Sequence, residues 1–288
     1  MSLSGAAKLA GVIGWPVTQS LSPRLHGFWL AELGINGALV PLSVRPEDFS
    51  TVVRALILAG FKGASITIPH KEAAFALSHD CDLAARAAGA VNLLIFHDDG
   101  RIEGRNSDAA GFSASLRERL GAAAGRGSVA VILGAGGAAR AVAVALQEQG
   151  ASEVRIVNRS RALAEHLVAS LAPQLTVKLS VFELKDWPNA AKDAGLVVHA
   201  TSAGTEGSPA LDLSLAPLPR TAVICDIVYN PLETDLLKRA GAAGFATIDG
   251  LGMLMHQAVP AFAAFFGATP KVSPALRQHL EEALAREH

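Results

Sequence analysis

The chain has 288 residues, and its 25 Lys and Arg residues against 26 Asp and Glu residues give a formal net charge of −1. Half of the residues are apolar and only 18% are charged, which is typical of a globular chain with a sizeable core. The length predicts two domains of roughly 150 residues each and excludes a small disulfide-stapled scaffold. Without a basic surplus, nucleic acid and anionic membranes are unfavourable main partners, so we expect small-molecule partners.

Cysteine usage and apolar runs indicate where the protein works. Cys81 and Cys225 lie far apart and outside any metal-ligand spacing, so we expect two buried free thiols and no metal site. The amino terminus lacks the long apolar core of a signal peptide. Gly, Pro or charged residues interrupt the other apolar runs before the ~18 residues of a membrane helix. These features predict a cytoplasmic protein.

The first hundred residues alternate short β-rich runs with helical stretches. A helix is expected to begin with Ser22 as N-cap and Pro23 at the first helical position, and to run to about Gly34. Asp98-Asp99-Gly100 predicts a hairpin turn into a short strand. This alternation favours an α/β fold with a mostly parallel sheet. The expected strands are Leu9–Gly14, Ala38–Val44, Ala64–Ile68, Ala90–Phe96 and Arg101–Gly104, and the further helices are Pro46–Ala59 and Asp80–Ala88.

A second series of strands and helices follows a Gly- and Ala-rich connector at Gly121–Ser128, which marks a domain boundary nearby. Asn106-Ser107-Asp108 precedes the helical stretch Ala109–Leu120 just before this connector. The later expected strands are Val129–Leu133, Val154–Val157, Leu196–Ala200 and Ala222–Ile227, and the later helices are one ending at Gly150, Arg161–Leu171, Met253–Phe266 and Ala275–Arg286.

The strand Val129–Leu133 leads directly into the glycine-rich turn Gly134–Arg140 and then into an alanine-rich helix. This is the Gly-x-Gly-x-x-Gly/Ala fingerprint of dinucleotide binding in its strand, turn and helix setting. Gly134 permits the turn, Gly136 lets a pyrophosphate approach the backbone, and Ala139 lets the helix pack closely. The alternative is a glycine-rich turn without a ligand. The predicted cofactor-binding residues of the turn are Gly134, Ala135, Gly136, Gly137 and Ala138.

The next strand ends at Asn158-Arg159-Ser160-Arg161, about 20 residues after the fingerprint. An NAD site would place Asp or Glu there for the ribose 2′-hydroxyl. Guanidinium groups instead match a 2′-phosphate in charge and bidentate geometry. We therefore predict NADP as the cofactor and Asn158, Arg159, Ser160 and Arg161 as its ligands. Alternatively, the two arginines are ordinary solvated residues at a helix start.

Polar side chains gather where predicted strands end. Ligands of open parallel sheets bind beyond the carboxyl ends of the strands, so these clusters could converge on one crevice. The clusters are Gln19–Pro23, Ser65–Lys71, Gly89–Asn92 and Asn106–Asp108.

Taken together, these segments resemble the shikimate dehydrogenase family, and the resemblance covers essentially the whole chain. No single motif is decisive, but their joint occurrence in one order makes coincidence implausible. The motifs are Ser20-x-Ser22-Pro23, Thr67-x-Pro69-x-Lys71, Gly89-Ala-Val-Asn92, Asn106-x-Asp108, Gly134–Arg140, Asn158-Arg159-Ser160, Ala200–Gly204, Asp226–Tyr229 and Asp249–Gln257.

The resemblance implies NADP-dependent interconversion of 3-dehydroshikimate and shikimate, a step towards chorismate and the aromatic amino acids. It implies Lys71 and Asp108 as the catalytic pair, and it puts Thr201 and Gly250 near the nicotinamide half of the cofactor. The implied substrate ligands are Ser20 and Ser22 for the carboxylate, Thr67, Asn92, Asp108 and Gln257 for the ring hydroxyls, and Tyr229 in the pocket wall.

The chemistry agrees with these residue types. Ketone reduction leaves a developing alkoxide, which a cation and acid such as Lys71 stabilises and protonates, while Asp108 orients the ammonium. Taken singly, Lys71 would be a solvated helix-start residue, Asp108 and Ser22 would be N-caps, and Gln257 would be a satisfied core amide. Their joint occurrence favours the functional interpretation.

The sequence departs from the family pattern at two places. Ser65 stands where members often carry Asn, which leaves a shorter donor for one substrate hydroxyl. Leu163 stands where a second arginine usually completes the NADP clamp, and Arg161 could substitute for it. His70 and His256 lie beside the implied site, and we expect both to be structural.

We therefore predict a two-domain α/β enzyme. Residues 1–107 and 251–288 would form the substrate-binding and catalytic domain, and residues 108–250 the Rossmann-type dinucleotide-binding domain. One alternative is a quinate/shikimate dehydrogenase using NAD, and another is a non-catalytic dinucleotide sensor of the same fold. A monomer and a homodimer are both compatible with the family, and we expect neither a nucleic-acid nor a membrane partner.

Overall fold

The computed structural model describes residues 3–121, 125–205 and 208–286. The chain separates into two compact units, which we call the first unit, Met1–Ser107 with Gln257–His288, and the second unit, Asp108–His256. Both units are built from strands and helices, so the α/β prediction is confirmed. The chain returns from the second unit to the first between His256 and Gln257, inside helix α10 (Leu251–Phe266). This point lies a few residues beyond the expected boundary at 250/251.

The first unit contains a mixed six-stranded sheet within its described residues, in the order β2-β1-β3-β5-β6-β4. β1 pairs in parallel with β2 and β3, whereas β5 runs antiparallel to both β3 and β6. The chain reverses direction between β5 and β6 at the predicted hairpin turn. In this turn Gly100 has a φ of +84°, and the His97 N–H donates to the Arg101 carbonyl. The strands are β1 (Lys8–Gly14), β2 (Gly37–Ser43), β3 (Gly63–Ile66), β4 (Asp80–Cys81), β5 (Leu93–Phe96) and β6 (Ile102–Arg105).

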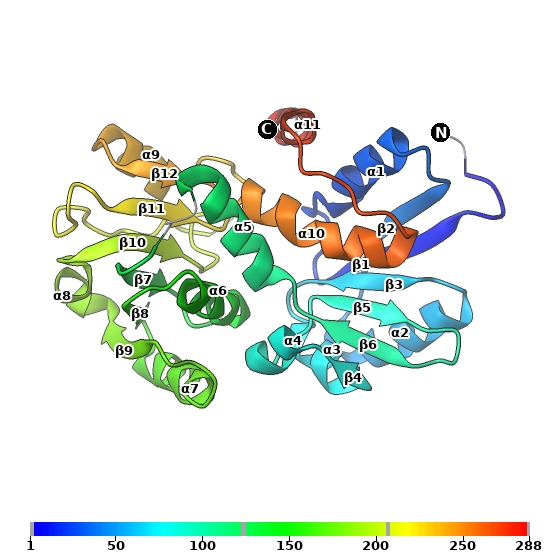
Figure 1. The fold of residues 1–288 in the computed structure, drawn as a ribbon, viewed down its shortest axis with the longest axis horizontal. Helices are drawn as coiled ribbons and strands as arrows, with labels where there is room; N and C mark the ends of the chain where they lie inside the picture. Colours follow the sequence, from blue (N-terminus) through cyan, green and yellow to red (C-terminus); the bar gives the residue numbers. More distant parts are fainter. Residues whose placement is uncertain (1–2, 122–124, 206–207, 287–288) are drawn as a thin grey trace. The chain divides into compact units, whose positions relative to one another are not determined.

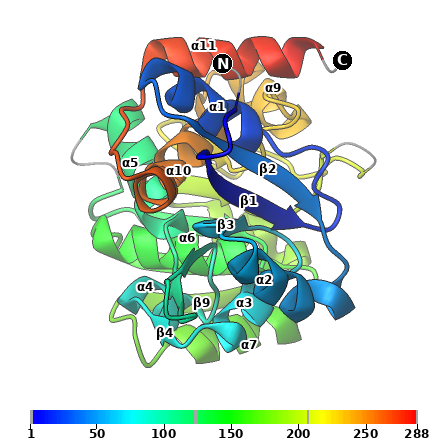
Figure 2. The ribbon, with the colours of Figure 1, turned by 90° about the vertical axis from the view of Figure 1, so that its right-hand side faces the viewer.

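Helices cover both faces of this sheet (Figure 2), with α1 and α11 on one side of β1 and β2 and with α2 and α3 on the other. Apolar side chains of α2, α3 and α4 join the sheet in one buried cluster that includes Phe49, Val53 and Ala74. On the opposite side, the ring of Phe262 packs on Trp29 at 5.4 Å between centroids. The helices are α1 (Ser22–Glu32), α2 (Phe49–Leu58), α3 (Lys71–Leu77), α4 (Leu83–Ala88), the later part of α10, and α11 (Pro274–Arg286).

Two local predictions for the first unit are wrong. The expected helix Asp80–Ala88 is instead the short strand β4 followed by α4, because the Asp82 carboxylate accepts the Ala85 N–H at 2.7 Å and starts the helix there. Ser22 is not an N-cap, because Leu21 holds that position and Ser22 is already helical.

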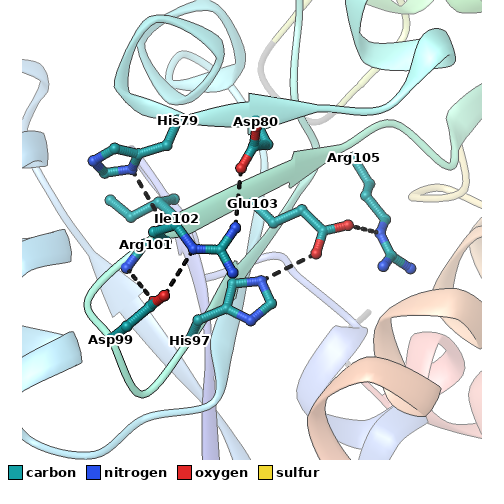
Figure 3. A network of polar contacts seen from close by, with 8 residues as sticks. All are labelled: His79, Asp80, His97, Asp99, Arg101, Ile102, Glu103 and Arg105. Carbon is teal, nitrogen blue, oxygen red and sulfur yellow. Dashed lines mark hydrogen bonds and ion pairs between the residues drawn. The ribbon is translucent and has the colours of Figure 1, made fainter.

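The edge of this sheet at β4 and β6 carries a network of charged side chains (Figure 3). Arg101 lies 2.8 Å from Asp99 and 3.2 Å from Asp80, while Glu103 pairs with Arg105 at 2.6 Å and with His97 at 3.1 Å. Asp80 lies on the edge strand β4, where a charge disfavours pairing with the sheet of another molecule.

The second unit contains a parallel six-stranded sheet within its described residues, in the order β12-β11-β10-β7-β8-β9. Helices lie on both sides of this sheet (Figure 1). Side chains of β7 alternate between two buried clusters, so that Ala130 and Ile132 pack with α5, α6 and α7 while Val131 and Leu133 pack with α8 and α9. The strands are β7 (Val129–Leu133), β8 (Glu153–Asn158), β9 (Lys178–Glu183), β10 (Ala194–His199), β11 (Val223–Asp226) and β12 (Ala246–Ile248). The helices are α5 (Asp108–Leu120), α6 (Gly137–Glu148), α7 (Arg161–Leu171), α8 (Trp187–Ala191), α9 (Asp235–Ala242) and the start of α10.

Several smaller expectations have mixed outcomes. Both cysteines are free, and Cys225 is buried, but Cys81 is only half-buried. The expected connector Gly121–Ser128 lies partly outside the described residues. Within the described ranges, none of the helices is long and apolar enough to cross a membrane.

Candidate active site

The loop after β1 carries the two serines predicted to bind a carboxylate. Ser20 is half-buried, and its Oγ accepts the backbone N–H of Ser22 at 3.3 Å. Ser22 is 8% exposed and opens α1 ahead of Pro23, which provides no N–H of its own. The structure therefore brings both hydroxyl-bearing residues to the start of one helix, where N–H groups and the helix dipole favour an anion.

The loop after β3 holds Thr67 and Lys71. The Thr67 N–H donates to the Ile13 carbonyl at 2.9 Å, which joins this loop to the end of β1. Lys71 is the first residue of α3 and is half-buried. Between them, His70 is 1% exposed, stacks on Phe49 at 4.8 Å, and donates through Nε2 to the Val44 carbonyl at 2.8 Å. His70 thus has a structural role, and it holds the turn that leads into Lys71.

Asn92, Ser107 and Gln257 form a polar cluster in the first unit. Asn92 is 4% exposed and donates through Nδ2 to Ser107 Oγ at 3.0 Å and to Gln257 Oε1 at 3.4 Å. Asn92 Oδ1 accepts the Ser107 N–H at 2.9 Å, and the Ser107 hydroxyl donates to the Gln257 carbonyl at 2.9 Å. Segments that are 165 residues apart in the chain therefore meet both directly and through Ser107. Ser107 was missed as a site residue.

Asp108 and Tyr229 belong to the second unit. Asp108 is 5% exposed and is the first residue of α5 rather than the residue before the helix, so its carboxylate sits in the first turn, where the helix dipole favours a negative charge. Tyr229 is half-buried in the loop after β11. The preceding residue, Val228, donates its N–H to Asp226 Oδ1 at 3.0 Å and accepts the Gly250 N–H at 3.2 Å. Because Lys71 and Asp108 are in different units, their pairing stays a prediction.

The glycine-rich turn has a geometry that suits a pyrophosphate. Gly134 has a φ of +118°, and a Cβ there would come within 2.8 Å of the Ala200 carbonyl oxygen and 2.9 Å of Thr201 Cγ2. By contrast, a Cβ on Gly136 or Gly137 would meet no described atom within 4 Å. Gly136 is the N-cap of α6 and supplies no capping side chain. The N–H groups of this helix start can therefore bind phosphate, so these residues fit the predicted dinucleotide.

The loops beyond β10 and β11 are joined by a buried polar contact. His199 Nε2 lies 2.5 Å from Thr201 Oγ1, which also accepts the Ala203 N–H at 3.0 Å. On the other side, His199 Nδ1 lies 3.0 Å from Asp226 Oδ2, and this carboxylate accepts the Thr234 hydroxyl at 2.7 Å. His199 and Asp226 are 1% and 0% exposed. Through Nε2, the buried His199 fixes the side chain of Thr201, a predicted cofactor residue, to the interior of the second unit.

Gly250 also lies in this region and is buried. A Cβ at Gly250 would collide with the carbonyl groups of Ile227 and Val228, so glycine is required for the close approach of the two loops.

The segment after β8 carries the residues predicted to recognise a 2′-phosphate. Asn158 Nδ2 donates to the Ser160 carbonyl at 3.0 Å, and Ser160 Oγ caps α7 by accepting the Leu163 N–H. Arg159 and Arg161 are exposed. Arg161 Nε lies 2.7 Å from Glu165 Oε1 one helical turn later, a contact the sequence interpretation did not include.

Two family models match separate stretches of the chain. Residues 12–94 match the shikimate dehydrogenase substrate binding domain, and residues 119–228 match shikimate / quinate 5-dehydrogenase. A shikimate dehydrogenase (NADP(+)) from Paramagnetospirillum magneticum is 51% identical over 278 residues, which cover 96% of this chain and 98% of the relative. The chain belongs to the shikimate dehydrogenase family.

Solved structures related to the shikimate dehydrogenase family have the same fold over nearly the whole chain. Shikimate 5-dehydrogenase from Thermus thermophilus in complex with NADP(H) and shikimate is 34% identical, with a TM-score of 0.83 over 98% of this chain and 100% of that one. Quinate dehydrogenase from Corynebacterium glutamicum in complex with NAD is 29% identical, with a TM-score of 0.88 over 96% and 99% of the two chains.

Proposed function

We propose that this chain is an NADP-dependent shikimate dehydrogenase, which catalyses the reversible reduction of 3-dehydroshikimate to shikimate on the route to chorismate and the aromatic amino acids. Family membership over nearly the full length supports the activity. The observation that carries the assignment of the substrate site is the meeting of Asn92 with Gln257 through Ser107, because two predicted hydroxyl ligands from distant segments gather in one unit.

In this proposal the first unit binds the substrate. Ser20 and Ser22 bind the carboxylate beside the start of α1, where the environment favours an anion. Thr67, Asn92 and Gln257 bind ring hydroxyls through hydroxyl and amide groups that both donate and accept hydrogen bonds. From the second unit, Asp108 contributes a further hydroxyl contact and Tyr229 contributes to the pocket wall.

Lys71 and Asp108 are the proposed catalytic residues. Reduction of the ketone builds negative charge on the substrate oxygen, and a positioned ammonium group lowers the energy of that state and provides the proton. Asp108 accepts from the Lys71 ammonium and from the reacting hydroxyl, which fixes their orientation. In the reverse direction, the neutral Lys71 amine accepts the hydroxyl proton, while Asp108 again orients the amine and the hydroxyl.

The second unit binds the cofactor, which when bound supplies or accepts the hydride. The backbone around Gly134, Gly136 and Gly137 and the first turn of α6 bind the pyrophosphate. Asn158, Arg159, Ser160 and Arg161 bind the phosphorylated ribose, because guanidinium groups suit a 2′-phosphate. Thr201 and Gly250 line the nicotinamide half, where the buried His199 holds Thr201 in place.

Initial rates with shikimate and with quinate, each with NADP⁺ and with NAD⁺, test this function. We expect the highest kcat/KM for shikimate with NADP⁺. A clear preference for quinate with NAD⁺ would refute the assignment in favour of a quinate dehydrogenase. Saturable NADP⁺ binding without turnover of either acid would instead indicate a dinucleotide sensor.

The quinate alternative deserves the comparison because of specific side chains. Ser65 is shorter than the Asn found in many family members, and the exposed Leu163 provides no second arginine for the phosphate. Rates measured with both acids and both cofactors distinguish the effects of these two side chains. Ser65 should change the preference between the two acids, whereas Leu163 should change the preference between the two cofactors.

A further inference from the structure

We propose that Glu165 is a positioning residue that limits the preference for NADP over NAD by holding Arg161 in an ion pair. The inference rests on the proposed binding of the 2′-phosphate by Arg159 and Arg161. It assigns cofactor selectivity to a carboxylate on α7 that itself binds no part of the cofactor.

The contact between Arg161 and Glu165 is direct. Arg161 Nε lies 2.7 Å from Glu165 Oε1, and the two residues are four apart on α7, so their side chains lie on one face of the helix. Their side chains are 52% and 54% exposed. Arg161 is the first residue of α7, directly after the cap Ser160, so the pair stands beside the turn that carries Arg159.

A second ion pair, between Lys185 and Glu183, lies on the neighbouring strand β9 and just after it. Together with Arg159, Arg161 and Glu165, these residues form a cluster of charged side chains. In the ladder between β8 and β9, Asn158 is in register with Glu183. Lys185 Nζ lies 2.8 Å from Glu183 Oε2. The Lys185 ammonium, and to a lesser extent the charge of Arg161, holds the pKa of the Glu183 carboxyl below its usual range. Arg161, Glu183 and Lys185 therefore act on one another electrostatically.

The charges of this cluster are nearly balanced. Arg159, Arg161 and Lys185 provide three positive charges, Glu165 and Glu183 provide two negative ones, and Asp186 acts on Lys185 as a further negative charge. Arg159 has no ion-pair partner among the residues that the structure describes, whereas Arg161 and Lys185 each have one. A 2′-phosphate must therefore compete with Glu165 for Arg161, and the Glu165 carboxylate also repels it. NAD, which carries a hydroxyl at this position, meets no such competition.

Exposed ion pairs of this kind are weak, so Glu165 restrains Arg161 without abolishing its contact with phosphate. Removal of the carboxylate raises the net charge of the cluster by one and leaves the Arg161 guanidinium available. We therefore expect selectivity to change by a modest factor and to change in one direction, towards NADP.

The test is the substitution Glu165→Gln, which keeps the length of the side chain and its helix propensity. Equilibrium titrations with NADP⁺ and NAD⁺ give the ratio of the two dissociation constants without recourse to turnover. We expect the ratio Kd(NAD⁺)/Kd(NADP⁺) to rise between about twofold and tenfold, mainly through tighter NADP⁺ binding, and the gain to shrink at high ionic strength. An unchanged or lower ratio overturns the proposal.

The matched control is Glu281→Gln, which removes the same kind of pair, Arg277 Nε to Glu281 Oε1 at 2.8 Å, from α11 in the first unit. This control should leave the ratio unchanged. The double variant Arg161→Gln/Glu165→Gln tests the route of the effect, because the Glu165 substitution should lose most of its effect once Arg161 is absent. A full effect in that background overturns the role of Arg161.

The two proposals fail separately. If wild-type protein turns over shikimate with NADP⁺ while Glu165→Gln leaves the dissociation constants unchanged, the function stands and this inference fails. If the ratio rises but no substrate is turned over, the inference stands and the proposed function fails.

Discussion

Lys71 differs from an ordinary surface lysine in its setting. It begins α3 directly after the buried His70, whose ring is fixed by the Val44 carbonyl and by Phe49. The backbone of Lys71 is therefore held by a rigid turn, and a proton donor needs such support to be positioned on its substrate. We expect Lys71→Ala and Asp108→Ala each to lower kcat for shikimate oxidation by ~10²–10⁴, with a much smaller change in the KM for NADP⁺, because they act on the reacting oxygen.

Steady-state kinetics of the purified variants measure this effect. Lys62→Ala serves as the control, since Lys62 lies in the same unit, is 47% exposed and pairs only loosely with Asp98 at 3.9 Å. Turnover that survives undiminished in either of the two site variants would remove that residue from the proposed pair.

Single residues also show what the sequence could and could not predict. Gly134 was predictable because a strand, a tight turn and a helix leave only glycine at a φ of +118°. Ser107 was not, because a serine next to Asn106 and Asp108 has the local pattern of a helix start, and its bonds to Asn92 and Gln257 depend on segments distant in sequence. Ser22 was misassigned as a cap because the pattern Ser-Pro does not fix which residue is the first helical one.

At the scale of elements, two glycines precede the first turn of α6, and different physical requirements favour glycine at each. Gly134 has a backbone conformation that other residues rarely adopt and is crowded by Ala200 and Thr201. Gly136 has an extended backbone, with φ −92° and ψ −171°, and open space around its Cβ direction. We expect Gly134→Ala to destabilise the second unit by about 2–5 kcal/mol, the sum of backbone strain and overpacking.

Gly136→Ala should cost less than about 1 kcal/mol of stability, because alanine is merely a poorer N-cap than glycine. It should nevertheless raise the Kd for NADP⁺, since the added methyl group lies where the pyrophosphate approaches the backbone. Urea unfolding together with NADP⁺ titration measures both quantities. A Gly136→Ala protein that binds NADP⁺ as tightly as wild type would contradict the predicted pyrophosphate site.

The elements themselves were predictable to different degrees. The hairpin between β5 and β6 was expected because Asp98-Asp99-Gly100 encodes a turn locally. The antiparallel pairing of β5 with β3 was not expected, because strand direction depends on where the chain returns to the sheet. The helices α3, α8 and α9 and the strands β9 and β12 were missed, since each is short and its apolar residues show a helical or alternating pattern over too few positions.

At the scale of the whole first unit, one histidine couples stability to pH. His26 is 1% exposed among Trp29, Phe262, Phe265 and Phe266, and its Nδ1 has no hydrogen-bond partner among the described residues. Burial lowers the pKa of His26 from 6.5 to about 3. Between these values the unfolded chain binds a proton that the folded unit does not. Stability from the neutral imidazole is therefore present above pH 6.5 and is lost as pH falls towards 3.

The loss amounts to ~1.4 kcal/mol per pH unit, and on the order of 5 kcal/mol in full. Urea unfolding at several values between about pH 4 and pH 8 measures the slope. The slope gives the number of protons taken up on unfolding. We expect this number to be lower by about one in His26→Leu than in wild type, whatever the effect of the substitution on stability at neutral pH. His279→Leu, at an exposed position of α11, controls for the loss of a histidine. An identical slope for His26→Leu and wild type would contradict the prediction.

The discontinuous course of the first unit has a consequence for synthesis on the ribosome. The second unit is one uninterrupted stretch, Asp108–His256, and all of its strands have been translated before α10 is complete. The first unit is begun earlier but finished later, because the rings of Phe262, Phe265 and Phe266 that enclose His26 arrive with the last helices. Until then, the apolar face of α1 stays uncovered on the nascent chain, so the core around His26 closes only after α10 has been translated.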